Sequence, residues 1–188
     1  MKTLENKIVI CAALIAAVSF APCLVAQMDS PSTPSSATPA STTSAAPNAA
    51  NLTHGDRTFF RKAAEGGMKE VTVSQAVMGQ LTNPQVKDFA QTMVRDHTEA
   101  NTELAGLAAN KGVTLPAPDN DLAGKWSKKD SDTDKDYVEE MVSDHKDVVK
   151  LFEKASKSSD PDIAAFAQKM LPTLQHHLEM AQSLKQAL

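Results

Sequence analysis

Two copies of one nine-residue motif decide the fold: Phe89-Ala-Gln-Thr-Met-Val-Arg-Asp-His97 and Tyr137-Val-Glu-Glu-Met-Val-Ser-Asp-His145. Both follow the pattern aromatic-x-x-x-Met-Val-x-Asp-His, and they begin 48 residues apart. In each copy the aromatic residue, the methionine and the histidine recur every four residues, so on an α-helix they form one row along one face. The row is apolar except for the imidazole. The pattern therefore predicts two helices that each turn a titratable ring towards a core.

A partial third copy, Phe166-Ala-Gln-Lys-Met170, opens the last part of the chain, which carries His176 and His177. His177 continues the apolar row of this segment. His176 is one residue off the row, so we expect it to face a flank or solvent. His54 stands at the edge of the folded region and belongs to no motif. The sequence thus offers three inward-facing imidazoles on three different helices.

Apolar residues at helical spacing predict four long helices of roughly 25 residues each. An Asn or Asp followed by Pro is a strong start signal, because the side chain caps the helix and the proline fits its first turn. Asn83-Pro84 and Asp160-Pro161 supply this signal for the second and fourth helices. We expect Asp56 to cap the first helix and the third to begin between Asp132 and Asp134. No stretch of the domain alternates with period two for long, so the predicted class is all-α, a four-helix bundle.

A long connection, residues 112–132, separates the second and third helices. It is long enough to span one helix length, so these two helices could run parallel to each other. Residues 122–129 are expected to form a short helix that docks Trp126, the only tryptophan. In the first helix, Gly66-Gly67 indicates either the close approach of a neighbouring helix or a local break.

The first 52 residues are expected to serve export and tethering. A basic start, an uncharged apolar run over residues 8–21 and a small residue before Gln27 are typical of a secretory signal peptide, residues 1–26. Its apolar part is too short to span a bilayer as a finished helix. Residues 27–52 are mostly Ser, Thr, Ala and Pro, which predicts a disordered tether. One domain remains, residues 53–188.

Cleavage after Ala26 leaves a mature chain without cysteine, which excludes disulfides and thiolate metal sites. The alternative is lipid attachment at Cys23 after cleavage just before it, although Pro22 is unfavourable at that position. Either product would be periplasmic or outer-membrane-associated, with no integral membrane span left after cleavage. The net charge of −4 comes from interspersed residues, which argues against nucleic acid as a partner and against a polybasic membrane patch. No other partner follows from the sequence.

Four polar residues fall at similar heights in the predicted bundle. Glu70 and His97 lie 13 and 14 residues from the turn that joins their helices, and His145 and His177 lie 15 and 17 residues from theirs. At 1.5 Å per residue, the offsets within each hairpin differ by about one turn or less. One carboxylate and three imidazoles are therefore expected to converge at mid-height in the core. Helical bundles build metal sites in this way, from ligands on facing helices.

Two interpretations of these residues stay open. The first is a single transition-metal ion (zinc, iron or copper) held by Glu70, His97, His145 and His177, with Asp96 and Asp144 behind the ligands. The second is a purely structural role, in which the imidazoles form hydrogen bonds with Glu70, Asp96 or Asp144. Methionines stand four residues before His97 and His145, a spacing that suits copper but is more common in core packing.

Other kinds of site are not supported by the sequence. Asp130-x-Asp-x-Asp134 resembles the start of a calcium loop, but Lys135 stands where glycine is needed and Met141 where the bidentate Glu belongs. We interpret this segment as a solvated, acidic helix start. No nucleophile elbow or glycine-rich phosphate loop occurs. These absences favour a non-enzymatic protein.

These residues resemble a bacterial envelope family known as domain of unknown function 4142. The resemblance covers roughly residues 56–188 and rests on Glu70, Met93-Val-Arg-Asp-His97, residues 137–145, and Leu171-Pro-Thr-Leu-Gln-His-His177. It implies a ferritin-like four-helix bundle in a secreted or lipid-anchored protein. The family has no settled biochemical activity, so the resemblance bears on fold and compartment more than on function.

The chain departs from di-iron ferritin-like proteins, which carry Glu-x-x-His on two helices. The residues three before the histidines are Val94, Val142 and Leu174, which argues against ferroxidase or oxygenase chemistry. We therefore expect an exported, non-enzymatic bundle of the cell envelope, either stress-related or a metal-associated binding module. The alternatives are a metal-storage protein or metalloenzyme that uses the core histidines, and a purely structural or interaction module.

Overall fold

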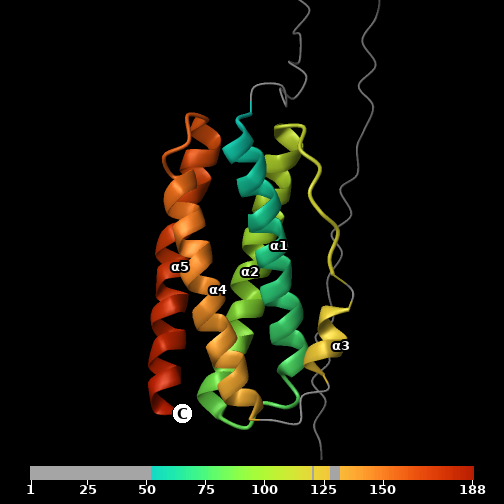
Figure 1. Ribbon diagram of the computed structural model, residues 1–188, viewed down its shortest axis with the longest axis vertical. Coiled ribbons are helices and arrows are strands. Elements are labelled where there is room, and N and C mark those ends of the chain that lie inside the picture. Colours follow the sequence, from blue (N-terminus) through green and yellow to red (C-terminus); the bar gives the residue numbers. More distant parts are fainter. Residues whose placement is uncertain (1–51, 120, 128–131) are drawn as a thin grey trace, which may run out of the picture. The chain divides into compact units, whose positions relative to one another are not determined.

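The computed structural model describes residues 52–119, 121–127 and 132–188, and within these ranges the chain forms five helices and no strand. They are α1 (His54–Val77), α2 (Pro84–Asn110), α3 (Leu122–Trp126), α4 (Thr133–Ala155) and α5 (Pro161–Ala187) (Figure 1). The four predicted long helices are α1, α2, α4 and α5, and α3 is the predicted short helix. The expected signal peptide and all but the last residue of the expected tether lie outside the described residues.

Three of the predicted helix starts are confirmed. Asn83 caps α2 by accepting a hydrogen bond from the Gln85 N–H at 2.9 Å, with Pro84 in the first turn. Asp160 caps α5 in the same way, and Asp132 caps α4. Side-chain caps of this kind satisfy backbone N–H groups that have no partner inside the helix.

The prediction that Asp56 caps α1 is wrong, because the cap is Thr53. The Thr53 hydroxyl accepts a hydrogen bond from the Asp56 N–H at 3.1 Å, and the Asp56 carboxylate accepts one from the Thr53 N–H at 3.0 Å. The two residues form a reciprocal capping box. Leu52, the last position of the expected tether, packs on the core next to this box.

Hydrogen bonds at the two ends of the bundle fix the direction of its helices. At one end, Asp134 at the start of α4 accepts the N–H groups of Thr82 and Asn83, which precede α2. At the other end, Lys111 after α2 pairs with Asp160 before α5 at 2.7 Å. The helices α2 and α4 therefore run parallel, and the described part of their connection, residues 111–119 and α3, returns along the bundle beside α1 (Figure 1). Asp134 is buried rather than solvated as the sequence predicted, because it caps this junction.

Two apolar cores fill the bundle above and below a polar layer. One core contains a cluster of aromatic rings, Phe59, Phe60, Phe152 and Phe166. The other contains Phe89, Met93, Tyr137, Met141 and the docked Trp126. Along each long helix, one buried polar residue separates the residues of the two cores: Glu70, His97, His145 and His177. The bundle thus places its buried polar groups at mid-height.

The two neighbouring glycines of α1 have different roles. The helix passes through both without a break. A Cβ atom on Gly67 would lie 2.0 Å from Oδ1 of Asn101 on α2, so the expected close approach is confirmed at this position. A Cβ atom on Gly66 would meet nothing within 4 Å. Of the two glycines, only Gly67 has a neighbouring side chain where its Cβ atom would lie.

We expect Gly66→Ala to raise the free energy of unfolding by about 0.5–1 kcal/mol, because alanine is the better helix former and has room there. Gly67→Ala should gain less or destabilise, since Asn101 must move. Urea denaturation of both variants, alone and combined with Asn101→Ala, measures the difference. Equal effects of the two alanines in the chain that keeps Asn101 would contradict the close-approach assignment.

Candidate metal centre

Three imidazole rings meet in the polar layer. They belong to His97 on α2, His145 on α4 and His177 on α5, and we call them the histidine centre. One nitrogen of each ring lies within 4.8 Å of a nitrogen of the other two. The ring centroids are 5.5, 5.4 and 5.4 Å apart, close to an equilateral triangle. Three nitrogens bound to one tetrahedral ion at about 2.0–2.1 Å would lie roughly 3.4 Å apart, so the rings must approach one another by at most about 1.4 Å to bind it.

Hydrogen bonds fix the tautomers of two of the rings. Nδ1 of His145 lies 2.9 Å from the carbonyl oxygen of Met141, which can only accept, so Nδ1 carries the hydrogen. Nε2 of His177 lies 2.9 Å from a carboxylate oxygen of Asp96, so here Nε2 carries the hydrogen. The opposite nitrogen of each ring, Nε2 of His145 and Nδ1 of His177, is therefore left with a lone pair.

These lone pairs have no hydrogen-bond partner. In the part of the chain that the structure describes, Nε2 of His97, Nε2 of His145 and Nδ1 of His177 are fully buried and unpaired. Buried polar atoms are nearly always paired in folded proteins, and leaving one unpaired costs about 1–3 kcal/mol. Hydrogen bonding within the core thus accounts for one nitrogen of His145 and one of His177. It does not account for three unpaired atoms in one place.

The surroundings keep the rings neutral. Burial, followed by the charges of the other two histidines, lowers the pKa of His97 to about 3. Burial, followed by the charge of His177, lowers the pKa of His145 to about 4. Burial also lowers the pKa of His177, although Asp96 acts in the opposite direction. Neutral imidazole is the form that binds metal ions.

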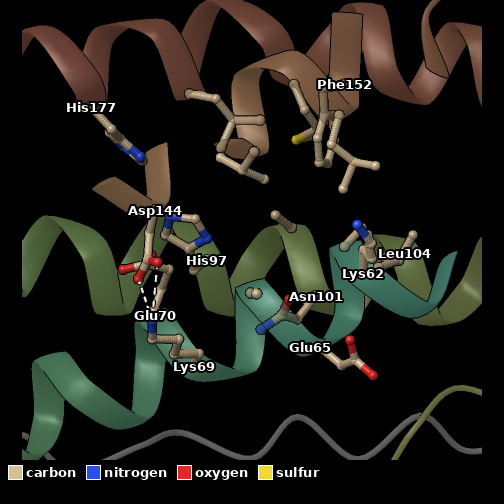
Figure 2. A pocket seen from close by; sticks show the side chains of 18 of the residues that line it. Lys62, Glu65, Lys69, Glu70, His97, Asn101, Leu104, Asp144, Phe152 and His177 are labelled. Carbon is tan, nitrogen blue, oxygen red and sulfur yellow. Dashed lines mark hydrogen bonds and ion pairs between the residues drawn. The ribbon is translucent and has the colours of Figure 1, made fainter. Parts of the chain in front are cut away.

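Glu70, the predicted fourth ligand, lies in the same layer but beside the three nitrogens. It lines the same cavity as His97 and His177 (Figure 2), yet the group of atoms within 4.8 Å contains none of its oxygens. Burial, and then the neighbouring carboxylate of Asp144, raise the pKa of Glu70 well above its usual range. Burial therefore favours the neutral form of the Glu70 carboxyl group.

The carboxylates predicted to stand behind the ligands have different partners. Asp96 accepts a hydrogen bond from Nε2 of His177 at 2.9 Å. Asp144 instead forms an ion pair with Lys69 at 2.7 Å. Lys69 was not singled out from the sequence, although its position next to Glu70 on a core-facing helix was a usable signal. His176 is exposed, as predicted, and so is His54.

Comparison with known proteins gives a family and a fold. A family model described as "Domain of unknown function (DUF4142)" matches residues 41–184. No curated protein matches the sequence. The chain is similar in structure to a DUF305 fragment from Deinococcus radiodurans, with a TM-score of 0.62, 11% sequence identity, and coverage of 72% of this chain and 98% of the fragment. At this identity the similarity concerns the helical fold alone. Among the described helices, none combines the length and apolar character of a membrane span.

The lowered pKa of His145 predicts how the stability of the metal-free protein depends on pH. Between about pH 6.5 and 4 the unfolded chain binds a proton at this ring and the folded chain does not, so stability falls as the pH falls. His145→Gln should reduce the slope of unfolding free energy against pH by up to about 1.4 kcal/mol per pH unit. Urea denaturation in EDTA, repeated over this pH range, measures the slope. The exposed control His176→Gln should leave the slope unchanged, and identical slopes for both variants would contradict burial of a neutral His145.

Proposed function

The chain belongs to the DUF4142 family, and we propose that it is a metal-binding helical bundle that holds one divalent transition-metal ion at His97, His145 and His177. One observation carries the proposal: three buried ring nitrogens converge without hydrogen-bond partners among the described residues. A single ion would bind all three nitrogens at once, with His97 in the tautomer that leaves the lone pair on Nε2. Imidazole ligands suit zinc, copper and iron.

The environment of the rings also supports a metal site. Metal-binding histidines usually donate their second nitrogen to a carboxylate or a backbone carbonyl, which fixes ring orientation and strengthens the ligand. Asp96 and the Met141 carbonyl occupy these positions for His177 and His145.

The parallel arrangement of α2 and α4, joined by a long connection, is what a ferritin-like topology requires.

The function that we propose is that of a binding module rather than of a di-iron enzyme. Glu70 is the one glutamate among the four buried residues of the layer, whereas di-iron sites are rich in carboxylates. The basic and apolar start of the chain supports export, and we place the protein in the periplasm or at the outer membrane. A metalloenzyme with the same ligands is the alternative, since three ligands leave a coordination position open.

Elemental analysis of the protein purified without a histidine tag tests the metal site. After incubation with zinc, copper or iron and removal of free metal, we expect about one ion per chain and a raised melting temperature. His97→Ala should lose the ion. His176→Ala is the matched control, because His176 is exposed, and it should keep the ion. A wild-type chain with no bound ion and an unchanged melting temperature would leave only the structural interpretation.

Asp96→Asn tests the hydrogen bond behind His177. Asparagine no longer stabilises the ring electrostatically, so metal affinity should fall by about 10–100-fold while one ion still binds at saturation. Competition with a chromophoric chelator measures the affinity. Asp147→Asn removes an exposed carboxylate that pairs only with Lys150 among the described residues, and it should change nothing. Equal affinities for the two variants would show that Asp96 has no part in the site.

A further inference from the structure

A cavity of about 560 Å³ adjoins the histidine centre. It lies between the four long helices, and its volume is in the range of pockets that hold small molecules. At one end it meets His97, His177 and Glu70 (Figure 2). Two of the unpaired nitrogens, Nε2 of His97 and Nδ1 of His177, thus belong to residues of its wall. We call this cavity the chamber.

Most of the wall away from this end is apolar. Leu104, Val148, Phe152, Phe166 and Leu174 contribute to it from three helices. On α2, Leu104 lies seven residues beyond His97, so the chamber extends for about 10 Å along the bundle. Apolar walls offer water few hydrogen bonds, so they favour a hydrocarbon occupant.

Charged side chains line the side of the chamber formed by α1 and α4. Lys62 and Glu65 on α1 and Asp147 and Lys150 on α4 are exposed and also contribute to its wall. These residues include both signs of charge, so this side selects weakly for the charge of a ligand. Selection must come from the interior, where the apolar wall and the histidine centre are in reach of one molecule.

We infer that the chamber binds a monocarboxylate with a hydrocarbon tail, its carboxylate on the ion and its tail along the apolar wall. The inference rests on the proposed metal site. Three imidazoles are neutral ligands, so a divalent ion held by them keeps its charge and an open position. A carboxylate supplies both the missing ligand atom and a compensating charge.

Gly66 offers a way to fill the chamber without disturbing the centre. It lines the chamber, and a Cβ atom there would meet nothing within 4 Å. Gly66→Leu should therefore occupy this space while the three histidines stay in place. Gly106→Leu is the matched control, because Gly106 is an exposed helical glycine with equally open surroundings and lies outside the chamber. Ala100→Leu, also in the wall, is a second filling variant on a different helix.

The experiment is calorimetric titration of the zinc-loaded full chain with octanoate, acetate and octanol, after zinc content has been measured for each variant. Octanoate should bind on the order of 100-fold more tightly than acetate, because its longer tail buries additional methylene groups. Octanol, which lacks the carboxylate, and octanoate with the EDTA-stripped protein should bind at least about tenfold more weakly. Gly66→Leu and Ala100→Leu should each lose at least about tenfold in octanoate affinity and keep zinc, and Gly106→Leu should match the wild type.

Three results would overturn the inference while leaving the metal site intact. They are equal affinities for octanoate and acetate, unchanged octanoate binding by both zinc-loaded filling variants, and equally tight binding to the stripped protein. A wild-type chain that takes up no zinc, copper or iron removes the metal proposal and this inference with it. The zinc measurement made before the titration separates that failure from the other three.

Discussion

The structure depends on one layer of buried polar groups that interrupts an otherwise apolar interior. His97, His145 and His177 each sit between residues of the two cores, and none is more than 5% exposed. Apolar contacts have no preferred direction, whereas a hydrogen bond or an ion pair in a core needs particular partner atoms. In this layer the His177–Asp96 hydrogen bond joins α5 to α2, and the Lys69–Asp144 ion pair joins α1 to α4, so these contacts set the heights of the helices in each pair relative to one another.

Much of this arrangement follows from the sequence because helix geometry is regular. A constant rise per residue makes distance from a turn a measure of height, so counting residues predicted that the three histidines converge. The same count placed Glu70 in the layer but could not reveal its direction. Its carboxyl group is next to Asp144 rather than among the ring nitrogens, which depends on side-chain conformation and not on helix spacing.

Helix caps and hydrogen bonds between distant segments were harder to predict from the sequence. Thr53 and Asp56 are both good capping residues, and the choice between them depends on which reciprocal pair of bonds forms. Asp134 was expected to be solvated because neighbouring acidic residues are typical of an exposed helix start. Its actual partners, the N–H groups of Thr82 and Asn83, are about 50 residues away in the chain. No local pattern encodes a contact of that kind.

The distribution of the three rings over the helices has a mechanical consequence. His145 and His177 belong to the hairpin of α4 and α5, whereas His97 belongs to the hairpin of α1 and α2. Any group that held all three rings would bond directly to both hairpins, in addition to the core packing and the hydrogen bonds that already join them at the two ends of the bundle. Separation of the two hairpins would then require breaking a bond to that group. Binding of such a group to the three rings would thus make the whole bundle stiffer.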